Sequence, residues 1–361
     1  MMPTELSKIR ALFQPATGSV YMDTATYGLP PMPTVDRMTA AIHAWQSGTA
    51  SWRTDWDEPA DETRRHFAYL IGAREAEIAR IPQSSVGTGL VAAGLTPDDE
   101  VVVPADEFTS TLFPMLVAER RGTSVRQVPF DDLASAIRPE TTLVATSLVQ
   151  MQTGRVADIS AICDRAEAVG ARVLVDGTQG VPFIALEGVI ERIDYLVCSA
   201  YKHLLCPRGV SFLYVKEARW DDLPPLNAGW RAADKPFDRY FGGPLTLAAD
   251  AARFDVSLGW IAWIGALTSL RLLGEWKSAG LLANVIDLSR SLAGHIGVSH
   301  HGSTLVCVPI DDMHGAQTLL LDARVKASIR GDSIRFSPHL YNDAADIVTA
   351  GDAILSLVAR K

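Results

Sequence analysis

The sequence predicts an α/β protein with a large three-layered domain, built on a mostly parallel central sheet, and a smaller α+β domain at the C-terminal end. Two observations predict the large domain. From about residue 68, helical and strand-like patterns alternate along the chain. Several strand-like segments are short, continuous apolar runs joined by helices of about a dozen residues, which is typical of parallel strands covered on both faces. A third observation, the loss of this alternation after Val215, predicts the second domain.

The expected elements of the large domain follow one another in the order of the chain. The apolar patterns predict helices over 66–73, 86–95, 111–122 and 158–171, and strands over 99–105, 123–130, 141–150, 172–180, 194–200 and 209–215. A loop region rich in Pro and Trp follows. The second domain is then expected to hold a long helix over 258–276, strands over 303–310 and 333–338, and a last helix over 343–360.

We expect three structural units. Residues 1–15 have the pattern of an amphipathic helix with charges throughout, so a segment over 1–20 is predicted to pack with the small domain. The large domain is placed at 21–255 and the small domain at 256–361. No internal repeat or low-complexity run suggests any other division.

The composition is that of an ordinary globular protein and limits the class of partner. Of 361 residues, 48% are hydrophobic and 21% charged, and the net charge is -9. This acidic balance gives no basic surface for nucleic acid or an acidic membrane, so we expect a small-molecule ligand. No signal peptide or stretch of 18 apolar residues is present, which favours a cytoplasmic protein.

The cysteines and histidines do not suggest a metal site. Neither residue type shows the spacing of metal ligands. The four cysteines lack CxxC spacing and are too few for a disulfide scaffold, so buried thiols in a reducing compartment are expected; they are Cys163, Cys198, Cys206 and Cys307.

The first chemistry-bearing position is Asp176, which ends the apolar run 173–175. Its carboxylate is expected at the carboxyl edge of the sheet, where ligands of doubly wound proteins collect. A buried carboxylate needs a partner, and the protonated ring nitrogen of a ligand is one candidate. The alternative is a helix cap, because Asp before small polar residues often caps the next turn. Gln179 could donate to a ligand oxygen beside such a ring.

Three further positions allow both an ordinary and a functional reading. Ser84 and Ser85 open a predicted helix, where they are either plain caps or part of a phosphate site. Lys202 is either a surface residue or a desolvated amine with a lowered pKa that reacts with aldehydes. Arg335, inside a strand-like run, is either an edge residue or a bidentate ligand for a carboxylate. Together with Asp176, these residue types indicate a pyridoxal 5'-phosphate (PLP) site.

The sequence resembles a known family over nearly its whole length, from VYMDTATYGLPP (20–31) to IRFSPHLYND (334–343). The strongest match is VLVDGTQG followed at the family's distance by SAYKHLLCPRG. The family is that of class V, fold-type I PLP enzymes, which includes cysteine desulfurases, kynureninases, isopenicillin N epimerase-like proteins and ergothioneine-type C-S lyases. The resemblance implies that Lys202 binds the cofactor aldehyde, Asp176 pairs with the pyridine nitrogen and Gln179 contacts the phenolic oxygen.

The resemblance also implies the remaining contacts. Phe108 takes the position where desulfurases have a histidine stacked on the cofactor ring, although a core aromatic is the alternative. Arg335 is expected to bind the substrate α-carboxylate. The segment ARFDVSLGW matches the one through which a partner subunit completes the phosphate site, so a homodimer and a contact from Ser257 are expected. The other phosphate contacts are expected from Ser84, Ser85, Ser199 and Tyr201, of which Tyr201 replaces a frequent histidine.

The chain departs from cysteine desulfurases before Arg335, where those enzymes carry a mobile loop with a catalytic cysteine. Here the segment RVKASIRGDS is short and has no thiol. The resemblance to ergothioneine-type C-S lyases therefore leads us to expect β-elimination on an S-substituted cysteine, giving a thiol, pyruvate and ammonia. Decarboxylation-coupled deamination, epimerisation and transamination use the same residues and stay open. By the same likeness Tyr27, Trp52 and Arg53 would lie near the substrate mouth, although packing explains the tryptophan nearly as well.

Overall fold

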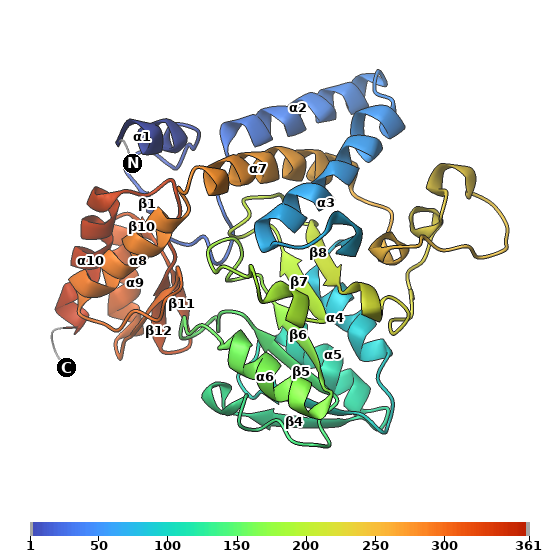
Figure 1. Cartoon of the computed structure of the whole chain (residues 1–361). Coiled ribbons are helices and arrows are strands. Elements are labelled where there is room, and N and C mark those ends of the chain that lie inside the picture. The colour runs from blue at the N-terminus through green and yellow to red at the C-terminus, as the bar shows by residue number, and fades with distance from the viewer. Residues whose placement is uncertain (1–2, 359–361) are drawn as a thin grey trace.

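The structure is a computed structural model that describes residues 3–358 (Figure 1). Its larger part is a seven-stranded sheet in the order β2-β8-β7-β6-β5-β3-β4. Only β8 runs antiparallel to its sheet neighbours, β2 and β7, and the other pairs are parallel. The strands are Ile78–Ile81 (β2), Glu100–Pro104 (β3), Ser124–Val128 (β4), Leu143–Ser147 (β5), Arg172–Asp176 (β6), Tyr195–Ser199 (β7) and Ser211–Val215 (β8). The predicted α/β class with a mostly parallel sheet is confirmed.

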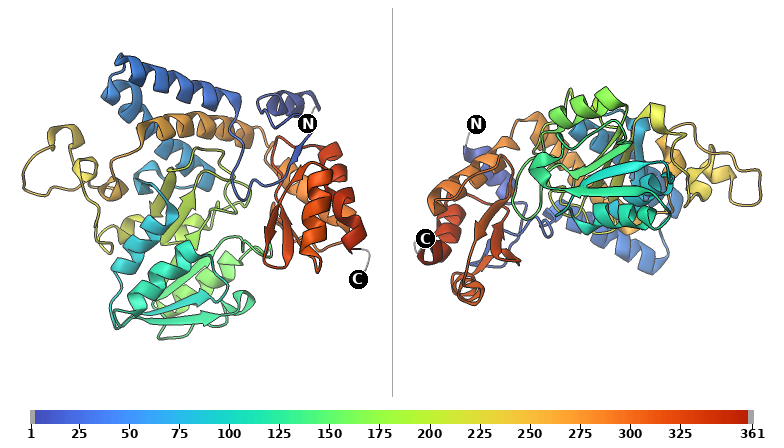
Figure 2. Two further views of the ribbon diagram at one scale, coloured as in Figure 1. Left: turned by 180° about the vertical axis from the view of Figure 1, so that it is seen from behind. Right: turned by 90° about the horizontal axis from the view of Figure 1, so that it is seen from below.

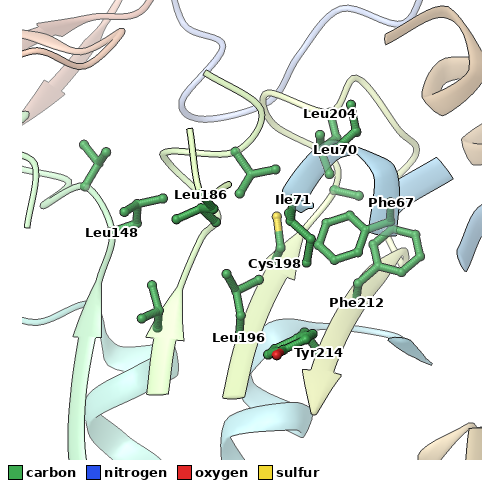
Figure 3. Close-up of a cluster of buried hydrophobic side chains, with 14 of the residues drawn as sticks. Phe67, Leu70, Ile71, Leu148, Leu186, Leu196, Cys198, Leu204, Phe212 and Tyr214 are labelled. Carbon is green, nitrogen blue, oxygen red and sulfur yellow. The ribbon is translucent and has the colours of Figure 1, made fainter. Parts of the chain in front are cut away.

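Helices cover both faces of this sheet, because side chains alternate between two cores. Within β6, Val173 and Val175 join one hydrophobic cluster while Leu174 joins the other. Figure 3 shows part of the first cluster, where the ring of Phe67 stacks on that of Phe212 with centroids 4.2 Å apart. Helices on this face are α3 (Glu58–Ile71), α6 (Ile159–Val169) and α7 (Trp260–Ser278), and those on the other face are α4 (Ser84–Ala93) and α5 (Thr109–Glu119).

The smaller part is built around an antiparallel sheet in the order β11-β12-β9. Its strands are Val306–Pro309 (β9), Ser328–Arg330 (β11) and Ser333–Phe336 (β12), and its helices are α8 (Ala283–Ile296), α9 (Met313–Asp322) and α10 (Ala344–Val358). A two-stranded parallel pair, β1 (Val20–Tyr21) and β10 (Val325–Lys326), joins the beginning of the chain to this part. Met22 then packs in the same core as β9, β12 and α10.

The N-terminal helix α1 (Pro3–Arg10) is shorter than predicted, and residues 1 and 2 of that prediction lie outside the described residues, as do 359 and 360 of the last predicted helix. After α1, the ring of Phe13 contacts Tyr341 at 5.2 Å and Trp276 at 6.1 Å between centroids. Helix α7 lies against α2 (Met32–Ser47) and α3, as Figure 1 shows. The domain boundaries at residues 20 and 255 remain a prediction, and α7, which follows the second of them, packs on the larger part.

Between β8 and α7 the chain forms a long irregular segment that projects from the body of the molecule, drawn in yellow in Figures 1 and 2. It exposes 96% of Phe241. Short helical turns interrupt this segment and other loops: Trp52–Asp57 (η1), Glu75–Glu77, Phe130–Asp132, Ile190–Arg192, Glu217–Arg219, Trp230–Ala232, Pro236–Asp238 and Ala251–Phe254. Among residues 3–358, none of the helices combines the length and hydropathy that a membrane span requires.

Candidate active site

A cavity of about 410 Å³ opens at the carboxyl ends of β5, β6 and β7, beside the first turns of α4 and α5. This is the edge of the sheet where ligands of doubly wound proteins bind. The structure brings eight of the predicted site residues together in its wall: Ser84, Ser85, Phe108, Asp176, Gln179, Ser199, Tyr201 and Lys202.

Asp176 is the last residue of β6 and only 4% of it is exposed. Its Oδ1 accepts a hydrogen bond of 2.8 Å from the backbone N–H of Thr178, and its Oδ2 accepts one of 3.3 Å from the hydroxyl of Thr111. Burial raises the pKa of this carboxyl, while Thr178 and the charge of Lys202 act in the opposite direction. The carboxylate is thus both a local cap and a buried charge, and a cationic ring nitrogen would stabilise its ionised form.

Lys202 follows β7, and 6% of it is exposed. Burial lowers the pKa of this lysine from 10.5 to about 8; Asp176 opposes the shift, and the charges of Arg335 and Arg330 add to it. Its Nζ lies 5.4 Å from the ring centre of Phe108 and 5.8 Å from that of Tyr201. The pocket therefore holds an amine that is neutral in an appreciable fraction near physiological pH, as reaction with an aldehyde requires.

The N-terminal segment fixes the loop that carries Lys202. The backbone N–H of Gly28 donates to the carbonyl of Tyr201 at 2.9 Å. A Cβ at Gly28 would lie 2.2 Å from the carbonyl oxygen of Lys202, so only glycine permits this approach.

The serines gather at the start of α4. Ser199 Oγ lies 3.2 Å from Ser84 Oγ and accepts a hydrogen bond of 3.4 Å from the Ser84 backbone N–H. A cation that the sequence analysis missed, Arg208, lines the same cavity with its guanidinium carbon 5.3 Å from the ring centre of Tyr201. Hydroxyls, a helix N-terminus and an arginine together suit a phosphate group.

Phe108 is held by a buried carboxylate that the sequence analysis also missed. Glu107 accepts hydrogen bonds of 2.7 Å from the backbone N–H groups of both Phe108 and Ser147. Burial raises the pKa of Glu107 to about 7, against the effect of these hydrogen bonds. The sequence around Glu107 does not indicate this role. Glu107 is buried against β5, and that strand begins 36 residues later in the chain.

The amide of Gln179 is oriented by groups from two other segments. Its Oε1 lies 3.0 Å from Nε2 of His203, and its Nε2 donates to the carbonyl of Ala25 at 3.1 Å. Burial lowers the pKa of His203 well below its usual value, so the ring is neutral, and because its Nε2 faces the amide oxygen of Gln179, this nitrogen is the donor. One N–H of Gln179 is left that could donate to a ligand oxygen.

Arg335 lies in β12 with 2% of it exposed and is not among the residues that line the cavity, although its charge acts on Lys202. Its Nη2 donates to the hydroxyl of Thr26 at 3.0 Å and lies 3.8 Å from Asp23. Its Nε and Nη1 are buried and have no hydrogen-bond partner among the described residues. Buried N–H groups without a partner are costly, and a carboxylate would satisfy both.

Besides Arg335, four other predicted residues do not line the cavity. Ser257 is exposed just after Ala251–Phe254, and 46% of Tyr27 is exposed next to Thr26. Trp52 stacks on Trp260 with centroids 5.3 Å apart, which is the packing role that the sequence left open. Arg53 pairs with Glu58 at 2.7 Å. Trp52 thus packs on α7 and Arg53 pairs with α3, and neither residue lines the cavity of this chain.

The cavity residues fit PLP. A phosphate needs N–H and hydroxyl donors with a cation, which the start of α4 and Arg208 offer. A flat ring with a protonated nitrogen needs a carboxylate and an aromatic face, and Asp176 and Phe108 line the cavity. The amine that would bind the cofactor aldehyde, Lys202, lines it as well.

Comparisons with known proteins identify the family and the fold. A sequence model described as aminotransferase class-V matches residues 20–292. "Uncharacterized aminotransferase YcbU" of Bacillus subtilis (strain 168) is 26% identical over 328 residues, 85% of this chain and 87% of that protein. "Probable cysteine desulfurase 1" of Mycobacterium leprae (strain TN) is 29% identical over 229 residues, 58% of this chain and 37% of that protein. A solved complex of the cystine C-S lyase C-DES with its reaction product cysteine persulfide shares the fold, with a TM-score of 0.83 and 21% identity over 95% of this chain and 98% of that chain.

The family match includes the strand that ends at Asp176 and the loop of Lys202, the two residues on which a PLP site depends. It ends at residue 292, so Arg335 lies beyond the matched segment. The pocket built around these residues and the match together lead to one conclusion: the chain belongs to the class V aminotransferase family of PLP-dependent enzymes.

Proposed function

We propose that this enzyme catalyses β-elimination on an S-substituted cysteine, cleaving the C-S bond to release a thiol, pyruvate and ammonia. The observation that carries the proposal is the set of reactive groups at the cavity. Lys202 lines it with a pKa lowered to about 8, whereas none of the described residues around it is a cysteine. Lys202 is thus placed to act as a base, while a persulfide mechanism has no thiol beside the substrate.

The four cysteines support this choice over desulfuration. Burial raises the thiol pKa of Cys163 and Cys307 to about 11 and also raises those of Cys198 and Cys206. Sulfur transfer through a cysteine requires the thiolate, which burial disfavours. Cys307 pairs with Arg335 across β9 and β12, in a strand rather than on a mobile loop.

Each residue has a defined task in the proposed reaction. Bound PLP supplies the electron sink for the negative charge that develops at the substrate α-carbon. Asp176 keeps the proton on the ring nitrogen, and Phe108 stacks on the ring. Lys202 would hold the cofactor aldehyde and, as a free amine, would take the substrate α-proton, a task that its pKa of about 8 suits. Arg335 holds the α-carboxylate through Nε and Nη1.

The remaining contacts hold the cofactor in one orientation. Gln179 donates to the phenolic oxygen, with its amide fixed by His203. Ser84, Ser85, Ser199, Tyr201 and Arg208 hold the phosphate. We further propose a cytoplasmic homodimer acting in thiol or natural-product sulfur metabolism, in which Ser257 reaches the phosphate site of the second subunit; its exposure and that of Phe241 on the projecting segment support this arrangement.

The decisive experiment is product analysis on a panel of cysteine S-conjugates. We expect the wild type to form pyruvate and free thiol in equal amounts. Lys202→Ala should form neither product and should lack the visible absorbance of lysine-bound PLP. Alanine, an aldehyde with carbon dioxide, or the D-isomer as the main product would contradict β-elimination and identify sulfur transfer, decarboxylation-coupled deamination or epimerisation, respectively. The 2-oxo acid that keeps the S-substituent would identify transamination. Absorbance unchanged in Lys202→Ala would remove this lysine from the site.

A further inference from the structure

Two arginines of one hairpin converge on a single threonine, Thr26. In the β11–β12 pair, Ser328 lies opposite Arg335, so Arg330, two residues along β11, presents its side chain on the same face. The Nη2 atoms of Arg335 and Arg330 donate to the same oxygen, Thr26 Oγ1, at 3.0 and 3.3 Å.

The hydrogen-bond network around these two cations contains one carboxylate, that of Asp23. Because Thr26 Oγ1 accepts from two arginines, its own hydrogen is directed to Ser328 Oγ, 2.8 Å away. The Ser328 hydroxyl donates in turn to Asp23 Oδ1 at 2.5 Å. Asp23 lies 3.8 Å from Arg335, and Arg330 forms no ion pair with any residue in the described part of the chain. The network therefore carries one positive charge in excess.

This excess charge acts on the active site. The charge of Arg330 contributes to lowering the pKa of both Arg335 and Lys202, which places it within electrostatic range of the reacting groups. Holding like charges together costs free energy, and an anion bound between them and the solvent would offset that cost.

The two arginines differ in what they can still bind. Arg335 is buried and keeps Nε and Nη1 for a group inside the site, which suits the α-carboxylate. Arg330 is exposed and lies further along the hairpin, toward its turn. A group that reaches Arg330 is therefore separate from the α-carboxylate and lies closer to the solvent.

We propose that Arg330 binds a second anionic group of the substrate, so that the preferred substrates are cysteine S-conjugates whose S-substituent carries a carboxylate or a similar oxyanion. This inference rests on the proposed function and specifies its substrate class. It makes Arg330 a specificity-determining residue, with Thr26 accepting a hydrogen bond from each of the two guanidinium groups.

The test uses two substrates of nearly the same shape, S-carboxymethyl-L-cysteine and its uncharged amide, S-carbamoylmethyl-L-cysteine. We expect the wild-type holoenzyme to prefer the acid by about tenfold in kcat/KM, the size of one charge-assisted hydrogen bond. Arg330→Gln should remove this preference by lowering kcat/KM for the acid alone, and Arg330→Lys should restore part of it. Arg335→Lys should lower kcat/KM for both substrates. Arg290→Gln, at an exposed arginine of α8 that pairs with Asp287, is the matched control and should change neither.

Dissociation constants are measured in parallel from the change in cofactor absorbance, so the result does not depend on the products. An equal loss for acid and amide in Arg330→Gln would place Arg330 on the α-carboxylate and overturn the inference, as would no change for either. A charge preference in binding that is lost in Arg330→Gln would support the inference even if no thiol or pyruvate formed, and the proposed function would then be the statement that fails.

Discussion

Replacing Lys202 with methionine in the cofactor-free protein tests whether the pocket itself prepares this lysine as a neutral amine. Burial lowers its pKa from 10.5 to about 8. The unfolded chain keeps the ordinary value, so between pH 8 and 10.5 it binds a proton that the folded chain has released. A depressed folded-state pKa of a lysine therefore contributes stability that is present above pH 10.5 and lost as the pH falls through 8.

The difference between the two pKa values fixes the size of the effect. At 1.36 kcal/mol for each pKa unit, the free energy of unfolding of the wild type should rise by about 3 kcal/mol relative to Lys202→Met between pH 7 and pH 10.5. Methionine keeps the unbranched side chain and lacks the charge. Other groups that titrate in this range, such as the tyrosines, are present in both proteins and cancel in the difference.

The assay is urea unfolding of both apo-proteins at several pH values, with the linear extrapolation applied at each. A difference between wild type and Lys202→Met that stays constant from pH 7 to 10.5 would refute the reasoning. Lys202 would then titrate as an ordinary lysine, and burial would not explain its role as a base.

Two further predictions concern residues that the sequence analysis missed. Arg208→Gln should raise the dissociation constant of PLP about tenfold in absorbance titrations of the apo-protein and leave that of pyridoxal, which has no phosphate, unchanged; an equal loss for both would exclude Arg208 from the phosphate site. Burial raises the pKa of Glu107 from 4.5 to about 7, so its contribution to stability is present below pH 4.5 and lost as the pH rises through 7. The wild type should accordingly lose about 3 kcal/mol relative to Glu107→Gln between these values in urea unfolding, and parallel pH profiles would show that Glu107 is an ordinary carboxyl.

The parts of the site that could be predicted from the sequence are those set by the ends of strands. Asp176 ends β6 and Lys202 follows β7, and these two strands are parallel neighbours in the sheet. Because the carboxyl ends of parallel strands meet at one edge, two polar residues after two apolar runs were sufficient to place them together. Ser84 was predictable for a similar reason, since a helix start after an apolar segment reaches the same edge.

The rest of the site depends on contacts between distant segments, which short apolar patterns do not reveal. Arg335 is held by Thr26, and the two-residue strands that bring these segments together are too short to be recognised in the sequence. The family resemblance suggested that Trp52 lies near the substrate mouth. Its position is decided by Trp260 of α7 instead, more than 200 residues later.

The pairing of β1 with β10 has a consequence for the synthesis of the protein. Val20 lies beside Val325, and Asp23 forms a bridge with Ser337, so the two sides of the carboxylate anchor are made about 300 residues apart. A ribosome completes the large sheet and Lys202 more than a hundred residues before it adds Arg335. A chain interrupted between these points would contain Asp176 and Lys202, which are proposed to hold PLP, and would lack the arginine proposed to bind the amino acid. The residues proposed for the cofactor and the arginine proposed for the substrate are thus synthesised at different times, and the arginine is made only with the small domain.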